Sequence, residues 1–365
     1  MSRKLSYHNV NKTPYLTWNW LKMNRGVLEA EIDEKIVPCA KISGANEGLA
    51  VYRDDGSGCA EIAELEQNLP FMAQSSSTDT TDIISSLRSV KFALVASKKC
   101  EENVVIDFAL KDGQTYSGSQ IIIAEPHAEL TVIMNYTSLP FDGGFCAIQT
   151  KIWAKEYSKV HIVKVQLLGQ KCIHLDDLQT LAQDNAEIEV TQVELGAGQT
   201  FANVTCSLEG FRSQFKSSTA YTAKAEQNLD MNYCVVHTGK DTVSEMTVKG
   251  TVSDNARKLY RGTIDFKRGC EGAKGNEQEE TLLASPTAVN RSIPMILCGE
   301  ENVEGAHGGN LGHLSAEELF YFMARGIDEE RAKTIMTRAK IMETARKIPD
   351  EQTVNRIKNF IGEEE

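Results

Sequence analysis

The sequence predicts a mainly β protein that ends in a small helical domain. Between about residues 118 and 298, the chain consists of short runs rich in β-branched and aromatic residues, separated by Gly, Asn, Asp and Ser. Such runs are typical of strands joined by turns. No segment of helical length separates them, which argues against a doubly wound α/β sheet. After residue 314, apolar residues recur at helical spacing instead.

The β-rich region is compatible with two architectures, a β-solenoid and a β-sandwich. Its clearest runs are residues 130–134, 161–167, 188–190, 233–236 and 260–266. In the last of these runs, Tyr260, Ile264 and Phe266 share one face of a strand. Small and polar residues between apolar ones suit the tight corners of a solenoid. The chain has no repeat of fixed length, however, so the pattern alone leaves both architectures open.

The first 117 residues are mixed in character. Strand-like runs occupy residues 90–96 and 104–110, whereas the polar run at residues 74–82 predicts a loop. We therefore divide the chain into a mixed N-terminal segment of residues 1–117, a β core of residues 118–313 and a C-terminal helical domain of residues 314–365.

Three helices are expected in the C-terminal domain. Ser315 and Glu318 have the spacing of a capping box that starts the first helix, and Gly326 stands where a left-handed C-cap is needed. A second helix begins after Asp328, and a third follows Pro349. Apolar residues at helical spacing in all three predict a compact helical appendage.

Acidic residues outnumber basic ones by 51 to 39, which gives a formal net charge of -12 at pH 7. The resulting field repels phosphate backbones and anionic lipids, so we expect neither nucleic acid nor membrane as a partner. No apolar run approaches the roughly 20 residues that are needed to cross a bilayer. The basic N-terminus lacks the apolar stretch of a secretory signal, which predicts a cytoplasmic protein.

The chain contains nine cysteines, and no two of them are closer than 20 positions. Structural zinc sites and ferredoxin-type sites usually include two cysteines that are about two to four residues apart. We therefore expect no self-contained metal site. A disulfide framework is not expected in a reducing compartment, so most of these thiols should be small buried residues.

Three stretches of the sequence together resemble a known family. They are residues 17–22, residues 227–262, and residues 301–312 with the helical residues 319–327 that follow. Their order and spacing resemble the SufB/SufD family of the Suf iron–sulfur cluster assembly system, most closely over about residues 185–347. The resemblance implies a right-handed parallel β-helix as the core. It therefore favours the solenoid over the sandwich.

A few positions distinguish the two branches of this family. SufB proteins have a cysteine shortly after a Leu-Leu pair, and a Glu-His-Glu segment near the end of the solenoid. This chain has Ala288 at the first position, and Ala306 and Gly308 on either side of His307. It therefore resembles SufD. It departs from many SufD proteins at Gly305, where they have a cysteine, which leaves the histidine as the only soft or borderline ligand in the segment.

The resemblance implies an assembly role rather than catalysis. A SufD-like scaffold subunit would pair with a SufB-like subunit through the solenoid, or form a homodimer when isolated, while a SufC-like ABC ATPase would bind the C-terminal helical domain. The chain lacks a Gly-rich phosphate loop followed by Lys and Ser/Thr, so it is not the ATPase itself. We expect no enzyme activity and no tightly bound cofactor. An iron–sulfur cluster would be held only transiently, at the interface of the complex.

His307 is the candidate ligand for iron or a nascent cluster at the SufB interface, because a neutral imidazole binds iron. The alternative is a turn histidine that holds a backbone carbonyl. Cys298 is a weaker candidate ligand, because core packing is the more typical role of a lone thiol. Phe320, Tyr321 and Arg325 have the composition of a partner-binding surface, although aromatic residues at helical spacing most often form a domain core.

Two other functions remain open from the sequence. One is a self-pairing SufB-like scaffold that binds a nascent cluster directly, which Ala288 and the missing glutamates beside His307 oppose. The other is a polysaccharide-active β-helix enzyme. Such an enzyme needs carboxylates or a metal on one face and is usually exported, so the absent signal and the helical C-terminus oppose it.

Overall fold

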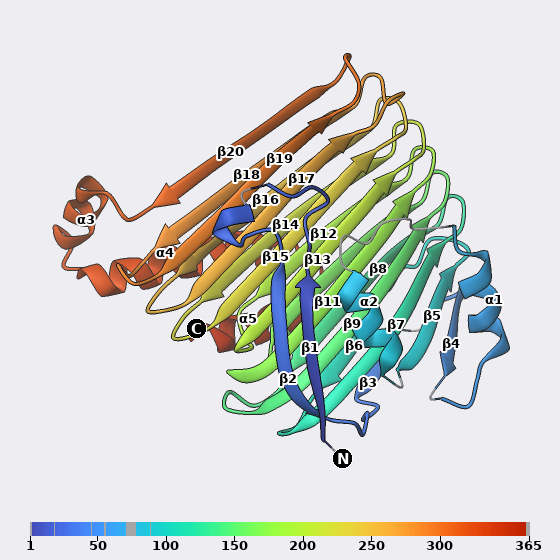
Figure 1. The fold of residues 1–365 in the computed structure, drawn as a ribbon, viewed down its shortest axis with the longest axis horizontal. Helices are drawn as coiled ribbons and strands as arrows, with labels where there is room; N and C mark the ends of the chain where they lie inside the picture. Colours follow the sequence, from blue (N-terminus) through green and yellow to red (C-terminus); the bar gives the residue numbers. More distant parts are fainter. Residues whose placement is uncertain are drawn as a thin grey trace.

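The computed structural model describes residues 2–17, 19–44, 46–54, 56–70, 78–87 and 89–362. The chain folds as a parallel β-solenoid of about eight turns with helices at its C-terminal end, which confirms the predicted fold class (Figure 1). From β5 onward, successive strands alternate between two nine-stranded sheets, so each turn of the chain adds one strand to each sheet. We call them the β19 sheet and the β20 sheet after their last strands.

All neighbouring strands in the two sheets are parallel except the first pair in each, β4 with β5 and β3 with β6. The β19 sheet contains β4 (Leu49–Asp54), β5 (Val90–Ala96), β7 (Gln114–Ala124), β9 (Gly143–Ala154), β11 (Lys171–Ala182), β13 (Gln199–Leu208), β15 (Asn228–His237), β17 (Arg257–Phe266) and β19 (Val289–Cys298). The β20 sheet contains β3 (Ala40–Ser43), β6 (Val104–Ala109), β8 (Glu129–Thr137), β10 (Lys159–Leu167), β12 (Glu187–Glu194), β14 (Gln214–Ala223), β16 (Val243–Val252), β18 (Lys274–Leu283) and β20 (Glu304–Gly312).

One corner of the solenoid repeats a left-handed residue on successive turns. These residues have φ between 55° and 65° and are His127, Tyr157, Asn185, Arg212 and Asp241. Each donates its backbone amide to a carbonyl on the following turn, as Tyr157 does to Asp184 at 2.9 Å. The side chains at this corner differ from turn to turn because they point outward. A structural repeat therefore exists without a visible sequence repeat.

Both faces of many central strands are buried. Inward-facing apolar residues form one cluster along the solenoid axis, and outward-facing residues of the same strands are covered by the terminal segments. In β11, for example, every residue from His174 to Ala182 is buried. Strands buried on both faces have near-continuous apolar runs instead of clean alternation. This is why periodicity alone did not define the architecture.

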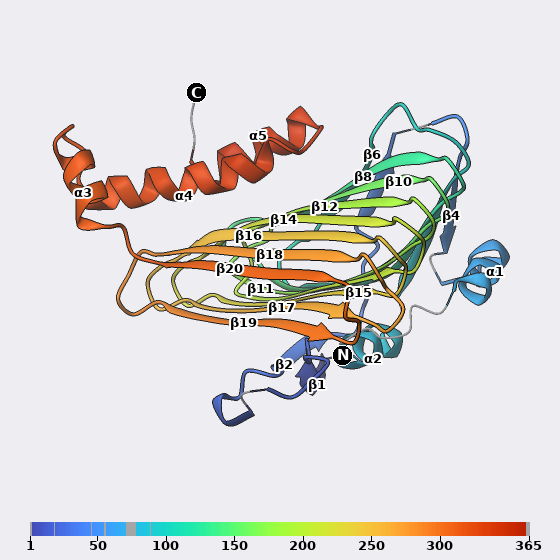
Figure 2. The same ribbon diagram turned by 90° about the horizontal axis from the view of Figure 1, so that it is seen from above.

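The N-terminal segment covers the outer face of the β19 sheet (Figure 2). It includes the antiparallel hairpin of β1 (Ser2–Val10) and β2 (Gly26–Asp33), the short 3-10 helix η1 (Asn19–Leu21), and the helices α1 (Ala60–Asn68) and α2 (Thr78–Ser86). The loop predicted for residues 74–82 is wrong from Thr78 onward, because Ile83 and Ile84 are buried against the sheet as one face of α2. Residues 74–77 and Trp18 lie outside the described residues.

The C-terminal helices lie on the opposite side, where α4 (Glu329–Ala345) and α5 (Glu351–Phe360) cover the β20 sheet (Figure 2). The predicted capping box starts α3 (Ala316–Met323): the Glu318 amide donates to Ser315 Oγ at 3.2 Å, and the Ser315 amide donates to Glu318 Oε2 at 2.8 Å. Gly326 has a φ of +75°, as expected for a left-handed C-cap.

A buried ion pair fastens the hairpin to the solenoid. The Arg261 guanidinium on β17 is fully buried and donates to Asp230 Oδ1 at 2.5 Å and to Asp230 Oδ2 at 3.1 Å. Its Nε donates to the Met23 carbonyl at 2.7 Å, and the Asn11 amide donates to Asp230 Oδ1 at 2.9 Å. Two separate parts of the N-terminal segment therefore meet one ion pair of the core.

Replacing Arg261 with Met should lower the free energy of unfolding by about 3–5 kcal/mol, because the buried Asp230 carboxylate would lose its charged partner. The hairpin should also become the first site of cleavage in limited proteolysis. Urea unfolding and protease mapping would measure the two effects. The control is Arg257→Met on the same strand, which is exposed and should change stability by less than about 0.5 kcal/mol. Equal stability of both variants would contradict this role of the ion pair.

Candidate functional site

Both sheets end in free edges at the same end of the solenoid. Within the described part of the chain, no strand pairs with the outer edge of β19 or of β20 (Figure 1). Every residue of β20 from Glu304 to Leu311 is exposed. A long exposed strand edge presents unpaired backbone donors and acceptors, so it is a template for pairing with another chain. We call this end, formed by β19 and β20, the mouth of the solenoid.

His307 lies on β20 and faces the interior side of the mouth. It is the direct register partner of Glu277 on β18, which is buried inside the solenoid, and register partners in a parallel sheet point to the same side. Gly305 supports this orientation, because a Cβ there would lie 3.0 Å from Phe266 Cε2 and 3.1 Å from Ile296 Cγ2, both on the other sheet. The histidine thus lies in a strand and not in a turn, and it is exposed at the open end.

Below His307, the interior contains a cluster of polar groups that includes Glu277. Lys258 is fully buried and forms an ion pair with Glu279, whose carboxylate also accepts from Ser292 and from Thr281, the latter at 3.1 Å. Burial and, to a smaller extent, the negative charge of Glu279 raise the pKa of Glu277 to about 7, while the charge of Lys258 and a hydrogen bond from Tyr260 oppose the rise. The interior of the mouth therefore contains ionisable groups beside apolar side chains such as Ile296.

Cys298 is exposed at the end of β19, which corrects the expectation that it packs in the core. Its thiol donates to the Glu300 carbonyl at 3.1 Å. The structure places the thiol and His307 on different sheets, at the end of one strand and in the middle of the other. Five of the nine cysteines are buried, as expected for small apolar side chains: Cys146, Cys172, Cys206, Cys234 and Cys270.

Two of the predicted partner-binding residues, Phe320 and Tyr321, lie exposed on α3, and Arg325 lies just after this helix, which protrudes beside the C-terminal end of β20 (Figure 1). Phe320, Tyr321 and Met323 are 69%, 55% and 56% exposed, and α3 has no buried residue. The Arg325 guanidinium lies 3.7 Å from the centre of the Tyr321 ring. These side chains do not form the core of a helical domain, contrary to the usual role of such a stripe.

A second polar cluster lies in the middle of the solenoid interior. Lys164 on β10 forms an ion pair with Asp176 on β11, next to His174 and to Glu194 on β12, and all four side chains are at most 2% exposed. Burial raises the pKa of Glu194 to about 8, and the neighbouring Asp176 charge adds to the rise. Burial, together with the Lys164 charge, lowers the pKa of His174 to about 3. Both carry no charge near pH 7.

The sequence did not reveal these interior charges. In the run of residues 161–167, Lys164 and Gln166 alternate with apolar residues, so an amphipathic strand would place them in solvent. The structure reverses the faces: Val163 and Val165 pack against the C-terminal helices, and the polar side chains point inward. Only knowledge of the helical cover over the β20 sheet would have given the correct orientation.

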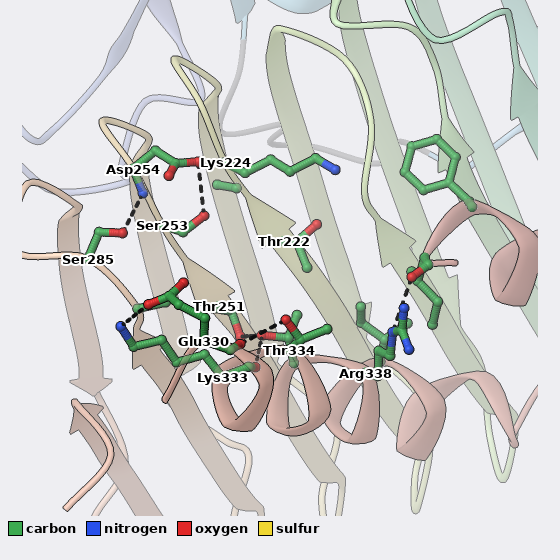
Figure 3. Close-up of a pocket in the computed structure, with 16 residues that line it drawn as sticks. Thr222, Lys224, Thr251, Ser253, Asp254, Ser285, Glu330, Lys333, Thr334 and Arg338 are labelled. Carbon is green, nitrogen blue, oxygen red and sulfur yellow. Dashed lines mark hydrogen bonds and ion pairs between the residues drawn. The ribbon is translucent and has the colours of Figure 1, made fainter. Parts of the chain in front are cut away.

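A cavity of about 310 Å³ lies between α4 and the solenoid (Figure 3). Several of its charged side chains are already engaged by protein groups. Lys333 pairs with Glu329 and Glu330, each at 2.9 Å, and Arg338 donates to the carbonyls of Ile361 and Gly362 at 3.2 and 2.7 Å. We interpret this cavity as a gap left by the packing of α4 against the solenoid, and not as a ligand-binding site.

No three His, Cys, Asp or Glu side chains among the described residues converge in a way that would hold a metal ion. If a cluster forms at the mouth, its ligands besides His307 therefore do not come from a preformed group of three such side chains. Among the helices of the described ranges, none is long and apolar enough to cross a membrane.

Residues 108–340 match a family described as "SUF system FeS cluster assembly, SufBD core domain". The matched segment is more than half of the chain and contains all the parallel strands from β8 to β20. The chain belongs to the SufBD family. The mouth of the solenoid and His307 both lie inside the matched segment of this SufBD chain.

Curated relatives of this SufBD chain include both branches of the family. It is 23% identical over 233 residues to the iron–sulfur cluster assembly protein SufD of Bacillus subtilis, covering 63% of the chain and 53% of the relative. It is 26% identical over 220 residues to SufB of the same organism, covering 60% and 44%. A chloroplastic SufBD family protein of Arabidopsis thaliana is 30% identical over 170 residues, covering 47% and 30%. The chain spans about half the length of these relatives or less.

Replacing Glu194 with Gln should flatten the dependence of stability on pH between about 4.5 and 8. In this window the folded wild type keeps a proton on Glu194 that the unfolded chain has lost, so its stability falls as pH rises. The difference between the two proteins should grow by roughly 3–5 kcal/mol across the window. Urea unfolding at several pH values would measure it.

The pKa of His174 acts in the opposite direction, because folding keeps its imidazole neutral and stability is lost as pH falls from 6.5 toward 3. Since both proteins retain His174, its contribution cancels in the comparison. Glu187→Gln is the control and should follow the wild type, because this carboxylate is only partly buried and pairs with Lys159 at the surface. A Glu194→Gln profile parallel to that of the wild type would contradict the assigned protonation.

Proposed function

We propose that this chain is a SufD-like, non-catalytic scaffold subunit of a Suf iron–sulfur cluster assembly complex. It pairs with a SufB-like subunit at the mouth of the solenoid and binds a SufC-like ABC ATPase through α3. An iron–sulfur cluster is held only transiently, where the two solenoids meet. The observation that carries the proposal is the fully exposed edge strand β20 with His307 on its inward face.

The geometry of the mouth supports pairing with a second solenoid there. Two unpaired strand edges lie side by side there, and β20 is nine residues long. A second solenoid with a similar open end would continue both sheets and satisfy their backbone groups. A Cβ added at Gly308 or Gly309 would meet no protein atom closer than 4.0 Å, so another backbone has room to approach. Pairing at this edge would bring His307 into the interface.

The choice of SufD over SufB rests on a few residues. His307 stands between Ala306 and Gly308 and not between two glutamates, and Ala288 occupies the position of the SufB cysteine. Overall identity is similar to both branches. A self-pairing SufB-like scaffold is therefore the second candidate. Copurification from a native extract separates the two, because a SufD-like subunit would recover a distinct SufB-like chain together with the ATPase.

The exposed aromatic residues of α3 support binding of the ATPase at this helix. Aromatic side chains beside an exposed Arg are typical of the few residues that dominate binding energy in protein interfaces. Phe320 and Tyr321 are exposed on α3, and a capping box defines the start of this helix. A short helix without buried residues gains little from tertiary packing, so a partner that covers its apolar side would supply that burial.

The double variant Phe320→Ala/Tyr321→Ala should weaken binding of the copurifying ATPase at least about tenfold, or ~1.4 kcal/mol. Its thermal stability should stay within about 0.5 kcal/mol of the wild type, because neither side chain is buried. Surface plasmon resonance and differential scanning calorimetry give the two quantities.

The matched control for this variant is Leu139→Ala/Phe141→Ala, in the loop between β8 and β9. These two residues are 70% and 74% exposed, so the control removes a similar exposed apolar area at a different corner of the molecule. Equal loss of ATPase binding in both double variants, or in neither, would contradict docking at α3.

His307→Ala should leave the stability of the isolated subunit within about 1 kcal/mol of the wild type, as for other exposed side chains. Cluster formation by the assembled complex should fall, because the mouth loses its imidazole. Calorimetry of the subunit and anaerobic reconstitution of the complex, followed by iron and sulfide analysis, provide the measurements.

His307→Cys should restore part of the activity, since a thiolate can replace an imidazole at iron. His313→Ala is the control, because that histidine is hydrogen-bonded to the Leu283 carbonyl at 2.7 Å and lies directly after the last strand, β20. Wild-type cluster formation by His307→Ala, or a loss of several kcal/mol of stability, would refute the interface role.

A further inference from the structure

We propose that Glu277 is a second iron ligand beside His307, so that the two side chains bind ferrous iron at the mouth before a partner covers it. The inference depends on the proposed function for the identity of the metal, since iron is a component of the clusters that the SufBD family assembles. Its structural basis lies in residues of this chain alone.

The placement of the two groups follows from the strand register. Glu277 and His307 are direct partners on the adjacent parallel strands β18 and β20. Paired side chains on one face of a parallel sheet are separated by about the strand spacing of ~4.8 Å, which one metal ion can bridge through a carboxylate and an imidazole. Glu277 is 3% exposed and His307 is exposed, so the metal would lie at the boundary between the interior and solvent.

Of the two carboxylates Glu277 and Glu279 below His307, Glu277 is the one that forms no direct ion pair. Both oxygens of Glu279 are engaged, one by Lys258 and Thr281 and the other by Ser292. No ion pair involving Glu277 forms within the described residues at 4.0 Å or less. Lys258 acts on Glu277 only beyond ion-pair distance, so a cation bound at the mouth would give this carboxylate a direct partner.

A second observation concerns the residue that positions the Glu277 carboxyl. The Tyr260 hydroxyl is fully buried and interacts with the Glu277 side chain. It lies against Gly262 together with the Glu277 carboxyl: a Cβ on that glycine would be 2.8 Å from Tyr260 Oη and 3.0 Å from Glu277 Cδ. The absence of a side chain at Gly262 leaves room for the carboxyl group. A hydroxyl beside a metal-binding carboxylate helps to orient that carboxylate.

The ligand set suits a metal that is passed on. Imidazole and carboxylate together bind ferrous iron, and two protein ligands leave most coordination positions free for water, sulfide or a thiolate of a partner. A site with only two protein ligands binds the metal weakly and exchanges it quickly. It also agrees with the absence of a three-residue metal group among the described residues, because the remaining ligands would come from outside this chain.

The test is anaerobic titration of the isolated full-length chain with ferrous ammonium sulfate, in competition with a chromophoric chelator. Glu277→Gln should bind iron at least about tenfold more weakly than the wild type, and His307→Ala should show a loss of similar size. The double variant should be no weaker than the weaker single variant, because either loss breaks the bridge. Melting curves establish that each variant is folded.

Two further variants make the outcome decisive. Glu277→Asp keeps the carboxylate and should retain part of the affinity for iron. The amide of Glu277→Gln can still hydrogen-bond to the imidazole of His307, but it is a poor iron ligand. Glu304→Gln, an exposed carboxylate on β20 paired with Lys274, should bind iron like the wild type. Wild-type affinity in folded Glu277→Gln, or no ferrous binding by the wild type, would overturn the inference.

Failure of this inference is distinguishable from failure of the proposed function. The titration uses the isolated chain, whereas partner pairing is measured by copurification with no iron added. If Glu277→Gln binds iron normally while the partners still copurify, only the ligand assignment is wrong. If the partners do not copurify but the iron affinity depends on Glu277 and His307, the metal site stands and the assignment to a Suf complex is wrong.

Discussion

The parallel hydrogen-bond ladder between successive turns is the constraint on which the rest of the structure depends. Each strand satisfies its backbone donors and acceptors with the strands one turn before and one turn after it, so only the two ends of the stack remain unsatisfied. The N-terminal end is blunted, because β3 has four residues and both β3 and β4 join their sheets antiparallel. The C-terminal end keeps a nine-residue exposed edge. The candidate site therefore exists because the last strand at the C-terminal end of the solenoid leaves its outer edge unpaired.

The polar interior is the feature that apolar packing alone would not produce. Two buried Lys–carboxylate pairs lie inside the solenoid, Lys164 with Asp176 and Lys258 with Glu279. Buried ion pairs often contribute little net stability, because desolvation opposes the Coulomb attraction. The apolar cover on both outer faces compensates for them, since the hairpin with α2 and the helices α4 and α5 bury the outward side chains of the central strands. That cover allows the interior to carry charge.

Local signals in the sequence predicted local structure well. The capping box at Ser315, the left-handed Gly326 and the strands at residues 90–96 and 260–266 all depend on residues close in the chain. The register between turns could not be predicted, because the corner residues vary and the turns differ in length. The pairing of Glu277 with His307, which are about 30 residues apart, follows only from that register. Sequence therefore identified the histidine but not its neighbour.

The two proposed partner surfaces are held at fixed positions relative to each other by α4. Lys340 on this helix forms an ion pair with Glu280 on β18, and Lys249 on β16 pairs with Glu343 at 2.7 Å. Between β20 and α3 the chain is short, and it is fixed by His313, which donates to the Leu283 carbonyl. α3 is thus attached at one end to β20, the last strand, and at the other end to α4, which forms ion pairs with β16 and β18. A partner bound to α3 would therefore act on the strands that form the mouth, because few freely moving residues lie between them.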